Sequence, residues 1–297
     1  LDGDKRNDLV VLWYDAANDQ TVMTILLSGP DGLQAPVHHF FAGVRGTRLA
    51  AGNLDGSGGP DLVFATATQI TILANSGNAR FDTPAQSYPI ASDAFAEVSE
   101  LVVADLNRDG RADAAVIYVG GADQASATTR LLVLLNDGAG GLGTAAPVGL
   151  PKTPYFFSIA DFAGAGAADL AVTYRDPSTK MLLAGVDLFR NSGAATFNPL
   201  QSYGGRGGKF LVADLSRDGR PDLIFQDTVL INNGSGGVTA GDPLSAAGQI
   251  PLAVGSLNGD AELDVAFDSG YLLSLGPLGQ GEPALRKFPD PPRRVFI

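Results

Sequence analysis

The chain of 297 residues lacks cysteine entirely, which excludes a disulfide framework and a thiolate metal site. No apolar run approaches the ~18 residues that a membrane-spanning helix requires. No segment shows convincing helical periodicity, so helices are not expected to build the fold. Basic residues are the minority, 20 against 32 acidic ones, for a net charge of −12. Such an acidic surface argues against nucleic acid or anionic lipid as a partner, although solubility alone also accounts for it.

Catalytic motifs are missing as well. The chain has no Gly-x-Ser-x-Gly elbow, no phosphate-binding loop and no zinc motif. Its two histidines, His38 and His39, are adjacent on an expected outer strand, where one of them must face outward. We therefore predict that the protein is not an enzyme. A polysaccharide- or lipid-acting enzyme is the least favoured alternative.

What the chain does contain is a repeated acidic loop of the form D-x-[DN]-x-D-G-x-x-D, which leads each time into a short apolar strand. Its copies end at aspartates spaced 42 to 56 residues apart, namely Asp8, Asp61, Asp113, Asp169, Asp222 and Asp264. A period of about 50 residues is typical of a repeat architecture. Because no long linker interrupts the spacing, we predict a single domain over residues 1–297.

Each repeat is expected to form four strands. An apolar run precedes the loop, a second strand follows it, and a third ends at a turn rich in Asn and Gly, such as Asn136-Asp-Gly138. A fourth, more polar strand carries a proline, which cannot donate a ladder hydrogen bond and so belongs at a sheet edge. The prolines concerned are Pro36, Pro84, Pro147, Pro199, Pro243 and Pro283. Four strands with the fourth at an edge describe a blade of a β-propeller.

The two ends of the chain are complementary in this pattern. Residues 293–297 read as the strand that precedes a loop, whereas Leu1 begins inside one. Joined head to tail, they would complete one repeat. We therefore predict an all-β propeller of six four-stranded antiparallel blades, closed by the C-terminal strand joining the N-terminal blade, with seven blades as the alternative.

The loops are predicted to bind calcium, because oxygen-bearing residues that alternate along a curled backbone can supply the six to eight ligands this ion takes. Ligands are expected at loop positions 1, 3, 5 and 9 and at the position-7 carbonyl, with glycine at position 6 for the sharp turn. The stronger sets are Asp105, Asn107, Asp109, Arg111 (carbonyl) and Asp113; Asp214, Ser216, Asp218, Arg220 (carbonyl) and Asp222; and Asp2, Asp4, Arg6 (carbonyl) and Asp8. The weaker sets are Asn53, Asp55, Ser57 and Asp61, and Ser256, Asn258, Asp260 and Asp264.

The fourth loop departs from this pattern. Ala163 and Ala165 replace two ligands beside Asp161 and Asp169, so we expect it to hold no ion. Counting the rest, the chain is predicted to bind about two to five Ca²⁺ ions. The alternative for every loop is that its Asp and Asn side chains only cap turns by hydrogen bonds to the backbone.

Together, the loop, the apolar strand before it and a turn similar to N-x-G-x-G-x-F resemble the FG-GAP/VCBS repeats of integrin α-chain heads and many secreted bacterial proteins. The turn occurs at Asn75 to Phe81 and at Asn191 to Phe197. The resemblance covers nearly the whole chain. It implies a β-propeller with calcium in the loops of one rim, acting in extracellular recognition or adhesion. The expected location is therefore secreted or cell-surface, with any signal peptide outside the printed chain.

One aromatic column is a candidate ligand platform. Trp13, Tyr118 and Tyr174 each lie five residues past the last aspartate of a loop. Exposed aromatic rings at one level could stack on sugars, as in a lectin, whereas blade-to-blade packing is the alternative. We predict a non-catalytic module that binds a glycan or a protein. The alternative is a structural or assembly part of a larger surface or secreted object.

Overall fold

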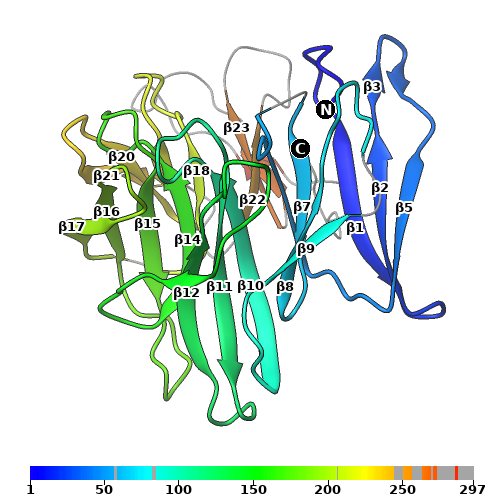
Figure 1. Cartoon of the computed structure of the whole chain (residues 1–297). Helices are drawn as coiled ribbons and strands as arrows, with labels where there is room; N and C mark the ends of the chain where they lie inside the picture. Colours follow the sequence, from blue (N-terminus) through cyan, green and yellow to red (C-terminus); the bar gives the residue numbers. More distant parts are fainter. Residues whose placement is uncertain are drawn as a thin grey trace. The chain divides into compact units, whose positions relative to one another are not determined.

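The computed structural model describes residues 1–56, 59–81, 85–205, 207–243, 250–255, 263–268, 270–272 and 285–286. Every helix or strand assigned within these ranges is a β-strand (Figure 1). A search of the same residues finds no helix long and apolar enough to cross a bilayer. The chain divides into two compact units, Leu1–Pro151 and Lys152–Ile297, which we call unit 1 and unit 2. The single domain expected over residues 1–297 stays a prediction.

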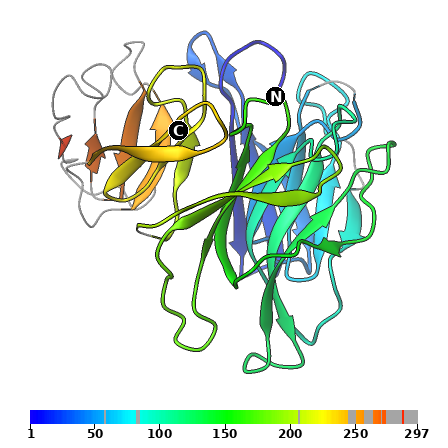
Figure 2. The ribbon, with the colours of Figure 1, turned by 90° about the vertical axis from the view of Figure 1, so that its left-hand side faces the viewer.

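Unit 1 contains three main sheets, whose strands are antiparallel and follow chain order. The first sheet consists of β1 (Leu9–Asp15), β2 (Gln20–Leu26) and β5 (Val37–Ala42), beside a small ribbon of β3 (Ser28–Gly29) and β4 (Gly32–Leu33). The second consists of β6 (Arg48–Gly52), β7 (Asp61–Ala65), β8 (Gln69–Leu73) and β9 (Gln86–Pro89). The third, cyan to green in Figure 2, consists of β10 (Phe95–Ala104), β11 (Asp113–Gly121), β12 (Thr128–Leu134) and β13 (Ala146–Pro147).

Unit 2 repeats the four-stranded pattern in three further sheets. The fourth sheet consists of β14 (Pro154–Ala160), β15 (Asp169–Tyr174), β16 (Val186–Asn191) and β17 (Phe197–Tyr203). The fifth consists of β18 (Leu211–Ala213), β19 (Asp222–Ile224), β20 (Thr228–Asn232) and β21 (Val238–Pro243). The sixth consists of β22 (Pro251–Gly255), β23 (Asp264–Phe267), β24 (Gly270–Leu272) and β25 (Leu285–Arg286).

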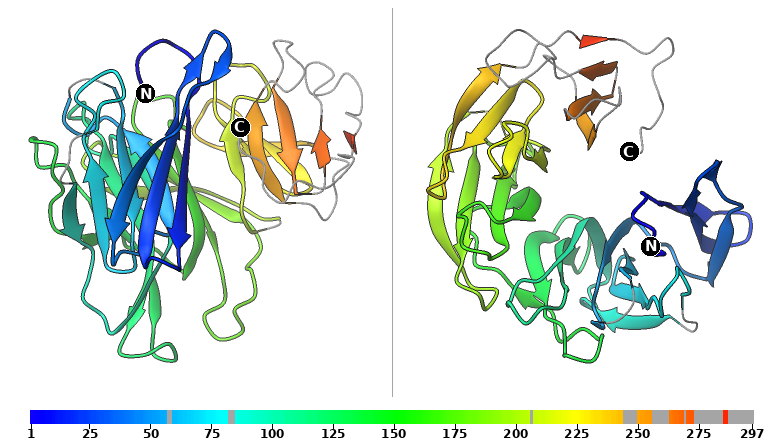
Figure 3. Two further views of the ribbon diagram at one scale, coloured as in Figure 1. Left: turned by 90° about the vertical axis from the view of Figure 1, so that its right-hand side faces the viewer. Right: turned by 90° about the horizontal axis from the view of Figure 1, so that it is seen from above.

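The second strand of each sheet is buried on both faces, which explains its continuous apolar sequence. All five residues of β7 are buried, and its side chains alternate between two clusters. Leu62 and Phe64 pack with the first sheet, which lies next to the second in Figure 3, whereas Val63 and Ala65 pack with the third. Within unit 2, Leu223 likewise contacts the fourth-sheet cluster and Ile224 the sixth-sheet one. Neighbouring sheets therefore pack face to face within each unit.

The predicted four-strand repeat is confirmed in five sheets of the described part, and the first sheet there has three strands. That sheet lacks a strand before its loop, and residues 293–297, predicted to supply it, lie outside the described residues. Three of the marked prolines lie in last strands as expected, namely Pro147, Pro199 and Pro243. Pro36 directly precedes β5, whereas Pro84 and Pro283 lie outside the described residues. The blade number and ring closure stay predictions.

Candidate functional site

The aspartate at position 9 begins the second strand in five of the repeats and is buried there. These anchor aspartates are 0–1% exposed, and they are Asp61, Asp113, Asp169, Asp222 and Asp264. A buried carboxylate is costly unless hydrogen bonds satisfy it. The backbone around the anchor aspartates supplies those bonds.

In the third repeat, Asp113 joins two separate segments. Its Oδ2 accepts a hydrogen bond from the Leu106 amide at 2.8 Å, and its Oδ1 accepts one from the Asn136 amide at 2.6 Å. The carboxylate thus ties the start of the loop to the end of the third strand. Three other repeats have such a pair of amide donors: Leu54 and Asn75 for Asp61, Ala163 and Asn191 for Asp169, and Leu215 and Asn232 for Asp222. The loop donor is at position 2 in each, except that Ala163 is at position 3.

The asparagine at the end of the third strand carries the connection into the neighbouring repeat. The Asn136 side-chain amide donates to Ala112 O at 3.1 Å in its own repeat, and to Leu54 O at 2.7 Å in the preceding loop. The same pair of bonds joins Asn75 to Pro60 and Leu1, and Asn232 to Pro221 and Phe162. We call Asn75, Asn136, Asn191 and Asn232 the anchor asparagines. The sequence pattern predicts Asn75, Asn136 and Asn191 only as turn residues, and in the fifth repeat it points to the neighbouring Asn233 rather than to Asn232.

Positions 1, 3 and 5 of the third loop point their oxygens at backbone amides of the same loop. Asp105 accepts from Arg108 N at 2.6 Å and Gly110 N at 2.9 Å. Asn107 and Asp109 accept from the amides two residues further on, each at 2.9 Å. In the fifth loop Asp214 accepts from Asp218 N and Gly219 N, and Asp218 accepts from Arg220 N. The turn-capping alternative is therefore present in both loops.

The fourth loop has the same shape without the ligand side chains. Asp161 accepts from Ala165 N at 2.9 Å and Gly166 N at 2.7 Å, as Asp214 does from the corresponding amides of the fifth loop. The position-1 carboxylate therefore holds this turn without side-chain oxygens at positions 3 and 5. In chemistry it does not fit calcium, because Ala163 and Ala165 offer no side-chain oxygen where positions 3 and 5 need one.

Two left-handed residues shape each of these loops. Glycine at position 6 has a positive φ as predicted, 84° at Gly110 and 83° at Gly219. Position 4 is left-handed too, with φ of 65° at Arg108 and 62° at Arg217. The sequence did not predict this conformation, because arginine rarely adopts a positive φ. At position 6 of the first loop Lys5 takes φ 68° in place of glycine. In the third and fifth loops, hydrogen bonds that backbone amides donate to the position-1 carboxylate hold these uncommon conformations in place.

The donor chemistry of the third and fifth loops fits calcium. A carboxylate oxygen has two lone pairs, so one amide hydrogen bond leaves the other available to an ion. Burial raises the pKa of Asp113, and the nearby charges of Asp109 and Asp105 raise it further. Burial raises the pKa of Asp222 too, with a contribution from Asp218. Acidic groups thus face one another in both loops. No cluster of three His, Cys, Asp or Glu placed to share a metal ion is found among the described residues.

The remaining loops are partly described. In the first, Asp4 N donates to Asp2 at 3.1 Å and Arg6 N to Asp4 at 2.8 Å, while Asp8 accepts from Ser28 N at 2.9 Å. In the second, Asn53 caps the turn through Gly56 N at 2.8 Å. The predicted ligands that lie outside the described residues are Ser57, Ser256, Asn258 and Asp260.

The aromatic column is corrected by the burial of its tyrosines. Tyr118 is 0% and Tyr174 1% exposed, so neither ring can stack on a sugar. Tyr118 instead donates to Asp93 Oδ2 at 2.8 Å, and burial together with that aspartate raises its pKa to about 12. Tyr118 packs in one cluster with residues of the second sheet, as the packing alternative expected, and Lys152 Nζ lies 4.8 Å from the centre of the Tyr174 ring. Trp13 alone is exposed, at 46%.

The two histidines lie on β5, at the edge of the first sheet. His38 is exposed, and its Nδ1 lies 3.0 Å from the Thr24 hydroxyl. His39 is partly buried, with its ring 5.9 Å from that of Phe81, and burial lowers its pKa. One histidine therefore faces outward, as predicted.

Comparison with known proteins identifies the repeat and supports the fold. Residues 53–116, which span the second and third loops, match the FG-GAP-like repeat family, and this confirms the predicted resemblance. No curated protein shows significant similarity to the chain. The crystal structure of BBS1N in complex with ARL6DN, soaked with mercury, is similar at 12% identity and a TM-score of 0.52. The match covers 97% of this chain and 82% of that one. With the repeated four-stranded sheets, it supports a propeller-like fold.

Proposed function

We propose that this chain is a calcium-stiffened, non-catalytic β-propeller that recognises a macromolecule outside the cell. The third and fifth loops are the proposed calcium sites, and six blades closed by residues 293–297 are the proposed ring. The calcium assignment rests on the arrangement of loop positions 1, 3 and 5. In the third loop these are Asp105, Asn107 and Asp109, whose side-chain oxygens surround a turn that already has its two left-handed residues in place. Such a loop binds calcium without first having to order itself.

In the third loop the ion would be held by Asp105, Asn107, Asp109 and the Arg111 carbonyl, with Asp113 beneath. Neutralising facing carboxylates with a divalent cation removes their mutual repulsion. At a free calcium concentration about ten times the dissociation constant, one occupied loop adds about 1.4 kcal/mol to the free energy of unfolding. Two loops together should raise the melting temperature of a chain of this length by about 4–5 °C.

Calorimetry with calcium and with a chelator tests this proposal. The variant Asp105→Asn/Asp109→Asn keeps the loop's side-chain shape and removes two charges, so it should lose about half of the calcium-dependent shift. Asp123→Asn is the matched control, because Asp123 also caps an exposed turn, through Ser126, but belongs to no acidic loop. A melting temperature that is the same with calcium and with chelator would show that the calcium assignment is wrong.

One observation favours the alternative of an assembly module. The edge strand β5 exposes Val37 by 54% and Phe40 by 61%, and Trp13 on the same sheet is exposed by 46%. Apolar side chains on a sheet edge favour association with another chain. Sedimentation velocity tests it: the wild type should self-associate as concentration rises, and Phe40→Glu should not. A wild type that stays monomeric at every concentration would refute self-assembly through this edge.

A further inference from the structure

Arginine occupies position 7 in the three acidic loops that have the stronger ligand sets. These residues are Arg6 in the first loop, Arg111 in the third and Arg220 in the fifth. The backbone carbonyl at this position is a proposed calcium ligand, whereas the guanidinium of the same residue is a cation and repels a calcium ion. Where that side chain lies therefore bears on how tightly each loop binds calcium.

In the fifth loop, Arg220 binds both oxygens of the position-5 carboxylate. Its backbone amide donates to Asp218 Oδ1 at 3.0 Å, and its Nη1 donates to Asp218 Oδ2 at 3.1 Å. Both side chains are partly exposed, so an ion from solution can reach the carboxylate. A proposed calcium ligand is thus paired with a cation that belongs to the chain itself.

The first loop has the same arrangement. Arg6 N donates to Asp4 Oδ1 at 2.8 Å, and Arg6 Nη1 lies 3.7 Å from Asp4 Oδ2. The two loops differ at position 6, which is Lys5 in the first and Gly219 in the fifth. Because the pairing recurs in both, it follows from the spacing of positions 5 and 7 along the turn.

The Arg220 guanidinium also lies against the turn that ends the third strand of its own repeat. A Cβ added at Gly234 would lie 2.5 Å from Arg220 Cζ. Gly234 therefore leaves the space that the guanidinium fills between this turn and Asp218. Above the equivalent Gly138 of the third repeat, the described residues leave that space open.

The arginine of the third loop is placed differently. Asp109 Oδ2 accepts from the Asn107 side chain at 2.9 Å, which is a neutral donor. Hydrogen bonds from two backbone amides of its turn lower the pKa of Asp137, and the charge of Arg111 lowers it further. The equivalent turn residue of the fifth repeat is the uncharged Asn233. The turn residue therefore accounts for the different placement of the two guanidinium groups.

We infer that the position-7 arginine of the fifth loop, and likewise that of the first, competes with calcium for the position-5 carboxylate. In the ion-free loop Arg220 neutralises Asp218, which otherwise repels Asp222. When the ion binds, it replaces the guanidinium at Asp218, because two cations at one carboxylate repel each other. The arginine thereby raises the calcium concentration at which the loop fills. The inference rests on the proposed calcium function and deepens it, because it names a residue that sets the affinity.

Calorimetric titration of the full chain with calcium tests the inference. The parent for this test is Asp4→Asn/Asp105→Asn/Asp109→Asn, which weakens the first and third loops. Adding Arg220→Gln removes the guanidinium and keeps the backbone carbonyl. The fifth loop should then bind calcium about two- to fivefold more tightly, the size expected for loss of an exposed ion pair.

The third loop supplies a comparison at the same loop position. Arg111→Gln is measured in a chain whose fifth loop is weakened by Asp214→Asn/Asp218→Asn. It should increase the calcium affinity of the third loop by less than Arg220→Gln increases that of the fifth. The reason is that the Arg111 charge acts on Asp137 of the turn.

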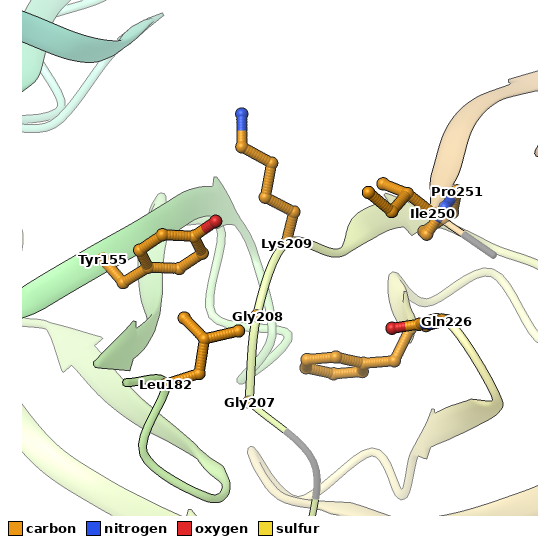
Figure 4. Close-up of a pocket in the computed structure, with 9 residues that line it drawn as sticks. Tyr155, Leu182, Gly207, Gly208, Lys209, Gln226, Ile250 and Pro251 are labelled. Carbon is orange, nitrogen blue, oxygen red and sulfur yellow. The ribbon is translucent and has the colours of Figure 1, made fainter. Parts of the chain in front are cut away.

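Lys209→Gln is the matched control for the loss of one positive charge. Lys209 precedes β18, the strand that leads into the fifth loop, and it lines an apolar cavity of about 210 Å³ at the opposite strand end (Figure 4). From Lys209 to Asp214 an extended chain spans about 16 Å. That is beyond the ~8–10 Å over which exposed charges act in physiological salt. This variant should bind calcium as tightly as the parent.

Nuclear magnetic resonance of the arginine Nε–H groups reports on the guanidinium directly. The signal that disappears in Arg220→Gln belongs to Arg220. It should shift when calcium saturates the fifth loop, because the guanidinium leaves Asp218.

Three results would each overturn this inference alone: an unchanged calcium affinity in Arg220→Gln, an equal increase in Lys209→Gln, or an Arg220 signal that calcium does not move. Absence of calcium binding in both the wild type and the parent would instead refute the proposed calcium function, and this inference with it.

Discussion

The anchor asparagine of the third repeat offers a sharp test of how the repeats are joined. Asn136 is 8% exposed, and its side chain makes three hydrogen bonds, to Leu54 O, Ala112 O and Gly138 N, at 2.7, 3.1 and 2.8 Å. Asn136→Ala removes all three. At about 1 kcal/mol for each bond, the free energy of unfolding should fall by about 3 kcal/mol. That is a large fraction of the ~5–15 kcal/mol typical of a folded protein.

Asn136→Asp separates this role from simple packing. It keeps the volume of the side chain but points a carboxylate oxygen at the carbonyls of Leu54 and Ala112, where the amide donated before. A buried charge without a partner costs about 3–5 kcal/mol, so aspartate should be worse than alanine at neutral pH. If the side chain only filled space, aspartate would be the milder change.

Urea unfolding followed by circular dichroism measures both variants. Asn18→Ala is the matched control, because the exposed Asn18 amide donates only to Asp15, and its loss should cost no more than about 0.5 kcal/mol. The reasoning fails if Asn136→Ala costs no more than Asn18→Ala, or if Asn136→Asp is milder than Asn136→Ala.

Three further predictions concern other parts of the chain. Ala163→Asn/Ala165→Asp supplies oxygen ligands at positions 3 and 5 of the fourth loop, so calorimetry should show one more calcium ion bound than in the wild type. An unchanged number of bound ions would refute the role given to these positions. Burial and Asp93 raise the pKa of Tyr118 to about 12 in the folded protein, whereas a tyrosine in the unfolded chain loses its proton near pH 10. The free energy of unfolding should therefore fall as the pH rises from about 10 to about 12. Chemical denaturation at several pH values across that range measures this. Asp93→Asn should move the ultraviolet titration of Tyr118 part of the way back towards 10, with burial keeping the rest, and no movement would mean that Asp93 plays no part. Gly52→Ala places a Cβ 2.5 Å from Val103 Cγ1 and should cost about 1–3 kcal/mol in urea unfolding, whereas a neutral change would mean that β6 and β10 can separate there.

The strands were predictable because the features that define them involve only residues adjacent in the sequence. A continuous apolar run marks β7, and a proline marks each of the last strands β13, β17 and β21. In the fourth sheet, the apolar residues from Leu182 to Arg190 predict a longer third strand than the Val186–Asn191 that is present. Leu182 instead pairs with Arg175 in an isolated bridge and is 48% exposed. An apolar residue in an exposed loop has the same local sequence pattern as one in a strand.

The site was less predictable because its decisive contacts are not local. Asn136 and Leu54 are 82 residues apart, so no loop spacing could show that the turn asparagine reaches the preceding repeat. Tyr118 and Tyr174 share a strand position with Trp13, yet they are 0% and 1% exposed and Trp13 is 46% exposed. Tyr118 is buried among residues of the second sheet, a contact that no local spacing shows. Position within a repeat therefore predicts where a side chain lies along its strand, whereas its exposure depends on the next sheet.

The fourth loop separates the role of the anchor aspartate and asparagine from the role of loop positions 1, 3 and 5. It has lost its ligands at Ala163 and Ala165, yet Asp169 still accepts from Ala163 N and Asn191 N, both at 2.8 Å. The anchors therefore hold the repeat without an ion, because their partners are backbone amides. Ion binding at positions 1, 3 and 5 can add stiffness to a loop that is already folded. Substitution at positions 3 and 5 should then alter the calcium response, whereas substitution of an anchor aspartate should destabilise the fold itself.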